Sequence, residues 1–251
     1  MSEELGFRFT WYGHSCVHVE SEEGTSILID PWFGNPNSPL AADSIDRCDV
    51  MLVTHGHHDH LGAVPGEVSD ADSLAIARRT GPAWPAIHEL SLWLGSFDDL
   101  GAEVVGMNKG GSVEVRGLRV SMVHADHSAG DWTDATGTPL YLGEAAGFVV
   151  ELENGKRLYH AGDTALFGDM RLIGELHRPE LAFLPIGGHF TMDPPAAARA
   201  VELLGVATVV PIHYGTFPVL AGTPDLLREE LEHLDLGDVR VLDPAPGVSV
   251  S

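Results

Sequence analysis

Four potential metal ligands lie within one short segment of the chain. His55, His57, Asp59 and His60 form the pattern His-x-His-x-Asp-His, and imidazole and carboxylate groups are common ligands of transition metals. Residues two apart in an extended segment point to the same side, so His55 and His57 can reach one ion. Asp59 and His60 turn toward a neighbouring position as the chain enters a helix. Because one tetrahedral ion would not use all four side chains from so short a segment, the spacing suggests two metal ions side by side.

Such a pair of ions predicts hydrolytic chemistry. Two divalent ions about 3.5–4 Å apart would share a water molecule and lower its pKa toward neutrality, which gives a hydroxide nucleophile at pH 7. The ions would also polarise a carbonyl or phosphoryl oxygen of the substrate and hold its developing negative charge. Asp59 is a candidate for orienting this water or accepting its proton. The ligand types suit Zn, and also Mn, Fe or Ni, so ligand type by itself does not identify the ion.

The elements that must position these residues can be predicted from the apolar pattern. The histidines follow directly on Val50–Thr54, a continuous apolar run typical of a buried strand. Other strands are expected at 7–11, 16–20, 25–30, 103–105, 112–123 and 147–159, the last interrupted by a hairpin turn at 153–155. Helices are expected at 71–79 and 87–100, and from residue 170 onward helices (170–177, 194–204, 223–234) alternate with strands (181–185, 207–211, 239–242). A loop is expected at 128–143, and such a loop could cover a site.

This order of elements predicts an α+β fold in a single domain, residues 1–251. The expected architecture is a four-layer αββα sandwich, in which two mixed sheets pack face to face with helices outside. The two halves of the chain each run strands first and helices after, which hints at a duplicated arrangement.

Three downstream segments complete a pattern that resembles the metallo-β-lactamase superfamily. They are His124-Ala125-Asp126-His127-Ser128, His160-Ala161-Gly162-Asp163-Thr164 and Pro211-Ile212-His213-Tyr214-Gly215. The likeness runs nearly end to end, from Trp11-Tyr12-Gly13-His14-Ser15 to Phe217-Pro218. These flanking segments are similar to the metal-dependent hydrolase family that neighbours ascorbate-6-phosphate lactonase.

The resemblance implies a ligand set for two divalent transition-metal ions, with Zn as the first expectation. The first ion would be held by His55, His57 and His127. The second would be held by Asp59, His60 and His213, with Asp163 bridging the two. His124 is the alternative to His127, but the family pattern places the ligand directly before a serine and so favours His127.

Three other residues are candidates for supporting roles. By the resemblance, His14 lies near the metal centre and could contact a ligand or the substrate, although a plain turn residue is an equal alternative. His189 could donate a hydrogen bond to the substrate or leaving group, or only shape the rim of the site. Asp30 could brace a ligand histidine, or serve only as a turn residue. His58 is expected to face away from the ions.

The charge of the chain limits its partners. Asp and Glu number 37 against 14 Lys and Arg, which gives a formal net charge of −23. Nucleic acid and anionic membranes are normally bound by clusters of Lys and Arg, so neither is an expected partner. Two cysteines cannot build a disulfide framework, and no signal peptide or membrane-spanning run is recognisable, so a cytoplasmic location is expected. A homo-oligomer remains possible.

The expected function is therefore metal-dependent hydrolysis of an ester or lactone bond in a small molecule. The main alternative is a small-molecule or cyclic phosphodiesterase that uses the same metals. A diiron redox enzyme is disfavoured, because that branch of the superfamily usually has Glu where this chain has His57. The full ligand set argues against a non-catalytic protein that has kept the fold but lost its metal ions.

The net charge also predicts how stability depends on salt. Self-repulsion among acidic side chains destabilises the folded state, and dissolved ions screen that repulsion. We expect the melting temperature to rise between low and molar KCl, because the formal charge is −23. A melting temperature that is flat or falls over this range would contradict the prediction.

Overall fold

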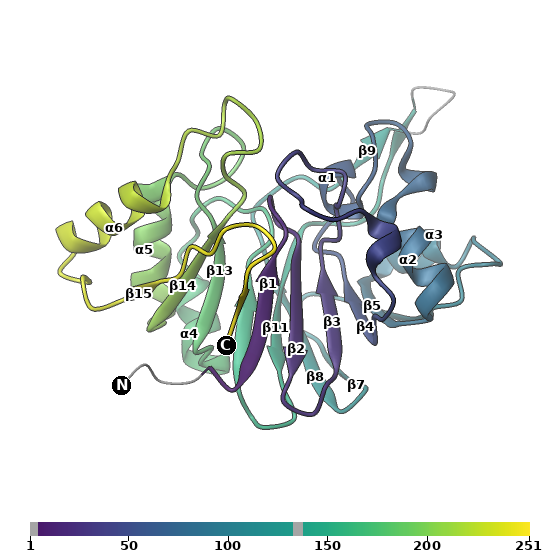
Figure 1. Ribbon diagram of the computed structural model, residues 1–251, viewed down its shortest axis with the longest axis horizontal. Helices are drawn as coiled ribbons and strands as arrows, with labels where there is room; N and C mark the ends of the chain where they lie inside the picture. Colours follow the sequence, from purple (N-terminus) through teal and green to yellow (C-terminus); the bar gives the residue numbers. More distant parts are fainter. Residues whose placement is uncertain (1–4, 133–137) are drawn as a thin grey trace.

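Two mixed β-sheets packed face to face form the centre of the molecule, and helices cover their outer faces (Figure 1). The structure is a computed structural model that describes residues 5–132 and 138–251. Within these residues each of the two sheets has seven strands, and six α-helices accompany them. The predicted α+β αββα sandwich is thereby confirmed, whereas a single domain over 1–251 stays a prediction. No helix in the described part of the chain is long and apolar enough to cross a membrane.

The first sheet has the order β16-β1-β2-β3-β4-β5-β6. Its strands are β1 (Phe7–Trp11), β2 (Val17–Ser21), β3 (Ser26–Ile29), β4 (Val50–Leu52), β5 (Ala83–Ile87), β6 (Glu103–Met107) and β16 (Ser249–Val250). The first three strands are antiparallel, and β3 to β6 run parallel. The helices on this side are α1 (His58–Leu61), α2 (Asp72–Thr80) and α3 (His88–Leu94), and 3-10 turns lie at Ala42–Ser44 and Val68–Asp70.

The second sheet has the order β15-β14-β13-β12-β11-β8-β7. Its strands are β7 (Ser112–Val115), β8 (Leu118–His124), β11 (Ala146–Glu151), β12 (Arg157–His160), β13 (Leu181–Pro185), β14 (Thr208–Ile212) and β15 (Arg240–Val241). The parallel part, β12 to β15, is covered by α4 (Met170–His177), α5 (Pro194–Leu204) and α6 (Pro224–His233) (Figure 1). A separate short pair, β9 (Asp131–Trp132) and β10 (Pro139–Leu140), lies within the predicted loop 128–143, of which residues 133–137 are outside the described part.

Packing between and outside the sheets follows from the apolar faces of the strands. The ring of Phe9 on β1 meets that of Phe183 on β13 edge to face, with centroids 5.3 Å apart, in the core between the sheets. On the outer face of the second sheet, Ala182 and Leu184 pack with Ala197 and Val201 of α5. Aromatic pairs and buried aliphatic side chains of this kind supply most of the free energy that holds such layers together.

Two sequence-based expectations about the elements were wrong. The predicted helix 87–100 is shorter, His88–Leu94, and the residues before it form the buried strand β5. A short apolar run cannot be assigned to a helix or a strand by periodicity alone. Pro85 also argues against a strand, because proline is rare inside a sheet. The predicted strand 112–123 is instead a hairpin of β7 and β8, because Arg116 and Gly117 both adopt positive φ and turn the chain.

The strand directions place many chain turns at one edge of the sandwich. β1, β3 and β4 run the same way in the first sheet, and β8, β12 and β14 run the same way in the second. Their carboxyl ends therefore lie at a common edge of each sheet, where following residues can converge on one site.

Candidate metal centre

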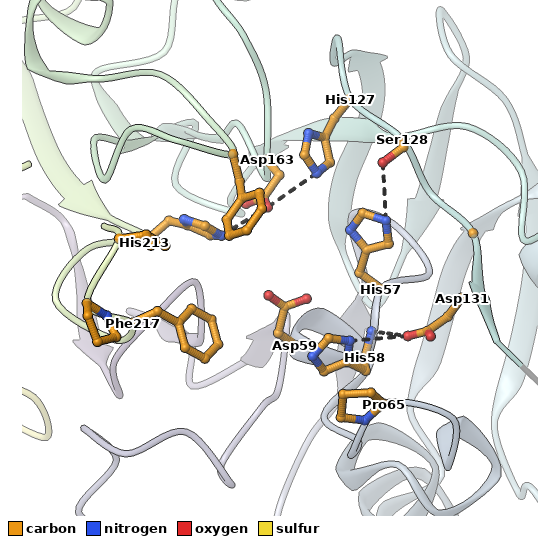
Figure 2. A pocket seen from close by; sticks show the side chains of 14 residues that line it. His57, His58, Asp59, Pro65, His127, Ser128, Asp131, Asp163, His213 and Phe217 are labelled. Carbon is orange, nitrogen blue, oxygen red and sulfur yellow. Dashed lines mark hydrogen bonds and ion pairs between the residues drawn. The ribbon is translucent and has the colours of Figure 1, made fainter. Parts of the chain in front are cut away.

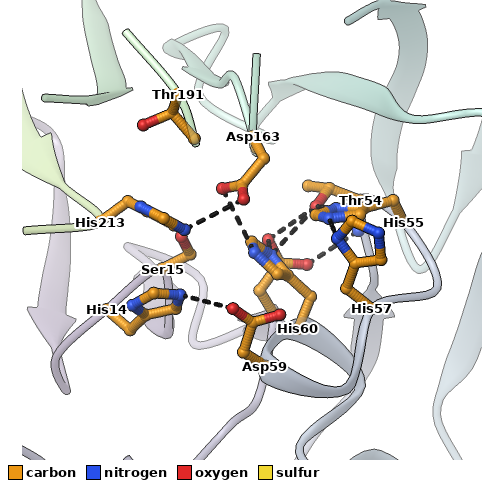
Figure 3. Close-up of polar contacts among 12 residues, drawn as sticks. His14, Ser15, Thr54, His55, His57, Asp59, His60, Asp163, Thr191 and His213 are labelled. Atoms are coloured by element: carbon orange, nitrogen blue, oxygen red, sulfur yellow. Dashed lines mark hydrogen bonds and ion pairs between the residues drawn. The ribbon is translucent and has the colours of Figure 1, made fainter. Parts of the chain in front are cut away.

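The predicted ligands follow the carboxyl ends of strands and converge on one place (Figures 2 and 3). His55 and His57 come after β4, and His60 lies in the first turn of α1. The remaining ligands come from the second sheet: His127 after β8, Asp163 after β12 and His213 after β14. The structure thus brings together all seven predicted metal ligands, from four segments that are distant in the sequence.

Asp163 lies at the centre of this cluster. Its Oδ1 is 3.2 Å from Nε2 of His60, and its Oδ2 is 3.0 Å from Nε2 of His213. Nε2 of His127 approaches the same Oδ2 at 3.6 Å (Figure 2). One carboxylate therefore faces histidines of both predicted ion sites, which is the position that a bridging ligand requires.

His55, His57 and His127 form the first group of potential ligands. One nitrogen from each lies within 4.8 Å of the others, and Nε2 of His55 is 2.8 Å from Nδ1 of His57. His124 does not join them, because it is the exposed last residue of β8 and contacts Lys109 and the ring of Phe167. The geometry therefore favours His127 over His124.

A second group combines Asp59, His60 and His213 with His14, again within 4.8 Å. His14 is fully buried in the turn between β1 and β2, and its Nε2 is 3.2 Å from Oδ2 of Asp59. The backbone N–H of His213 donates to the carbonyl of His14 at 2.8 Å and so ties the two sheets together beside the site. His14 is therefore inside the cluster rather than at its margin.

Asp30 and Thr54 brace two of the histidines from behind. Oδ1 of Asp30 accepts from the Thr54 N–H, and Oδ2 accepts from the Thr54 hydroxyl, both at 2.8 Å. Oδ2 also lies 2.8 Å from Nδ1 of His60, while the Thr54 hydroxyl oxygen is 3.0 Å from Nδ1 of His55. Because the Thr54 proton points at Asp30, both Nδ1 atoms are placed to donate. Nε2 of His55 and of His60 is then left with a free lone pair, as a metal ligand needs.

Two glycines permit the close approach of the chain segments. A Cβ atom on Gly56, between the first two histidines, would lie 2.5 Å from the Leu142 side chain. A Cβ atom on Gly162 would lie 2.7 Å from the Thr54 side chain, and Gly162 also has a φ of +62°. Side chains at either position would push apart the loops that carry the ligands.

The buried polar atoms of the cluster fit a bound cation. Nε2 of His60 and Oδ1 of Asp163 are buried and face each other at 3.2 Å, and among the described residues neither has a partner in hydrogen-bonding geometry. Burial alone would lower the pKa of His60, but Asp163 and Asp30 together raise the pKa well above its usual value. The protein therefore favours positive charge at this point, which a proton or a metal ion can supply.

His55, His57 and His127 are held in the neutral form that binds metal. Burial, with the nearby His60, lowers the pKa of His57 to about 4, and burial also lowers the pKa of His55 and of His127. Burial opposes ionisation of Asp163, yet His213 and His60 hold its pKa well below the usual range. At neutral pH these three histidines are therefore neutral imidazoles, and Asp163 is an ionised carboxylate.

A cavity of about 680 Å³ opens next to this cluster (Figure 2). Loop residues Ser128, Gly130 and Asp131 line it, as expected for the segment over the site. His58 was expected to face away from the ions, and it joins none of the ligand groups, but it does line the cavity. The reason is that Asp131 accepts from the His58 backbone N–H at 2.7 Å and lies 3.3 Å from its Nδ1.

His189 stands apart from the ligand cluster. Its side chain is exposed and packs edge to face against Phe190, which lines the cavity. A catalytic role for His189 stays a prediction.

The fold and this cluster can be compared with known proteins. The family model of the β-lactamase superfamily domain matches residues 25–214, a range that includes every residue of the cluster except His14. The chain belongs to the metallo-β-lactamase superfamily. Within this superfamily, its relatives carry the name UPF0173 metal-dependent hydrolase. One from Koribacter versatilis is 45% identical over 237 residues, covering 94% of this chain and 96% of the relative. One from Methanosarcina mazei is 43% identical over 244 residues, covering 97% of each.

Solved structures of the superfamily agree with this placement. Igni18, a metallo hydrolase from the archaeon Ignicoccus hospitalis, superposes with a TM-score of 0.80 at 36% identity, covering 98% of both chains. The membership in a family of metal-dependent hydrolases thus rests on sequence and fold together.

Proposed function

We propose that the protein is a binuclear metal hydrolase that cleaves an ester or lactone bond in a small molecule. The observation that carries the proposal is the position of Asp163, whose two oxygens face His60 on one side and both His127 and His213 on the other. The first ion would be held by His55, His57 and His127, and the second by Asp59, His60 and His213. Zn is our first choice, because it suits imidazole and carboxylate ligands.

The bound ions would supply an acidified water and a Lewis acid for the carbonyl oxygen. The residues of the chain orient this chemistry. Asp59 faces the cavity and is placed to accept a proton from the attacking water. His14 hydrogen-bonds Oδ2 of Asp59 and holds the carboxylate in position. His14 also lowers the pKa of Asp59, against the effect of burial, so this carboxylate is ionised and can bind a cation.

Metal content and substrate range test the proposal together. Protein purified without chelator is expected to contain up to two transition-metal ions per chain by elemental analysis. The substrate panel contains lactones, carboxylic esters, thioesters and phosphodiesters, assayed after reconstitution with Zn, Mn, Fe or Ni. Turnover of phosphodiesters alone would favour the alternative, a small-molecule or cyclic phosphodiesterase. Metal-free protein with full activity would refute the proposal.

The bracing role of Asp30 gives a separate prediction. Asp30→Asn removes one of the two carboxylate oxygens that hold Thr54 and His60, while asparagine tolerates the φ of +48° at this position. Loss of a partner that orients a metal-bound histidine typically weakens metal binding about 10–100-fold. We expect a loss of this size, measured by competition with a chromogenic chelator.

Asp49→Asn is the matched control for this change. Asp49 also accepts a backbone N–H in the first sheet, from Ser26 at 2.8 Å, but it lies outside the cluster. Equal metal affinities in the two variants would refute the bracing role of Asp30.

A further inference from the structure

Two chemically different kinds of side chain line the cavity beside the metal centre. Predicted ligands line it together with four apolar residues, Phe190, Phe217, Pro218 and Val219, and Figure 2 shows Phe217 in the same cavity as Asp59 and His213. Phe190 is 54% exposed and Val219 is 48% exposed, although both are large apolar side chains. Apolar side chains left in contact with water beside a reactive centre favour a ligand that covers them.

A second cavity, of about 390 Å³, adjoins the first. His58, Pro65 and Phe217 line both cavities and so form a partition between them. Phe217 is held in this place by Trp32, since the two rings stack with centroids 6.0 Å apart. The second cavity carries the acidic side chains Glu67, Asp70 and Asp72 on its wall.

The charge of the cavity walls limits the substrates that can bind. Among the described residues, the walls of both include no lysine and no arginine. The first wall has Asp131 besides the predicted ligands Asp59 and Asp163. Beyond the metal ions, an anionic part of a substrate would therefore meet apolar rings and carboxylates. Like charges brought together in this way oppose binding and slow the encounter.

We propose that the substrate carries an uncharged apolar group next to its scissile bond, and that this group lies against the wall formed by Phe190, Phe217, Pro218 and Val219. Substrates with an anionic group at this position are rejected. The inference rests on the proposed hydrolase function and specifies its substrate class. Contacts made by this non-reacting part of the substrate would supply binding energy for the reaction at the metal centre.

Two esters of equal length test the proposal. p-Nitrophenyl hexanoate and the p-nitrophenyl half-ester of adipic acid share the leaving group and the chain length, but the second ends in a carboxylate. We expect kcat/KM to be at least about tenfold higher for the hexanoate with metal-loaded enzyme. Equal values for the two esters would overturn the proposal.

Variants that introduce a charge on the wall make the test specific. Val219→Lys places a cation on the wall and is expected to lower the hexanoate-to-adipate ratio at least about tenfold, through faster turnover of the half-ester. Val219→Asp is expected to raise the ratio. Val248→Lys is the control, because Val248 is similarly exposed, at 52%, and lines neither cavity. The same shift in Val219→Lys and Val248→Lys would reveal an effect of net charge alone and would overturn the proposal.

A binding measurement separates this inference from the proposed function. Hexanamide and adipic acid monoamide are titrated by calorimetry into the wild-type protein and the Val219→Lys variant. Tighter binding of hexanamide to the wild-type protein, without hydrolysis of either ester or of any member of the substrate panel, would support the apolar wall and refute the hydrolase. Hydrolysis of both esters at equal rates, with equal binding of both amides, would leave the hydrolase standing and refute the apolar wall.

Discussion

Asp163→Asn is expected to abolish metal binding and hydrolysis together. Asparagine keeps the shape of the side chain but removes the charge that faces His60, His127 and His213. A metal ion contributes several kcal/mol of transition-state stabilisation, and each 1.36 kcal/mol is a factor of ten in rate, so we expect kcat/KM to fall by about 10³-fold or more. Elemental analysis and steady-state kinetics on the same preparation measure both effects.

The matched control for this variant is Asp126→Asn. Asp126 is an exposed carboxylate one residue before His127, and it lies outside the ligand groups. This variant should keep its metal and most of its activity. Unchanged turnover in Asp163→Asn would overturn the assignment of the bridging carboxylate, and with it the binuclear centre.

Removal of the metal ions is expected to lower the melting temperature substantially. The cluster gathers buried imidazoles and carboxylates from both sheets, so an ion bound there stabilises only the folded chain. An ion present at about 1,000 times its Kd adds about 4 kcal/mol, and a protein of this size shifts by about 2–4 °C per kcal/mol. We therefore expect the melting temperature to fall by about 10 °C on dialysis against a chelator.

Calorimetry before dialysis, after dialysis and after return of Zn measures this effect. The decrease should be reversible, and it should be much smaller in Asp163→Asn, which has little metal to lose. If elemental analysis shows that the protein is metal-free and the melting temperature is unchanged, the prediction that bound ions stabilise the folded chain is contradicted.

Much of the candidate site was predictable because its residues are local in sequence or follow strand ends. His55, His57, Asp59 and His60 lie within six residues, so their pattern indicates metal binding without any tertiary information. The alternation of apolar segments likewise predicted both sheets and most helices. The strand β5 was missed because five apolar residues containing Pro85 satisfy no single periodicity.

The orientation of individual side chains depends on backbone geometry that composition does not reveal. His14, Asp30 and His213 all adopt positive φ at the ends of strands, which turns their side chains into the cluster. His58 reaches the cavity because Asp131, 73 residues later, holds its backbone and ring. No local sequence pattern predicts such a contact.

The types of ligand, their order along the chain and the layered fold that carries them could therefore be predicted from the amino-acid sequence. How Asp163 lies among the histidines, and that His14 joins their cluster, became visible only in the folded molecule. Ligand types are properties of single residues, whereas the convergence of ligands depends on the packing of two sheets. The N–H of His213 donates to the carbonyl of His14, 199 residues earlier, only once those sheets have met.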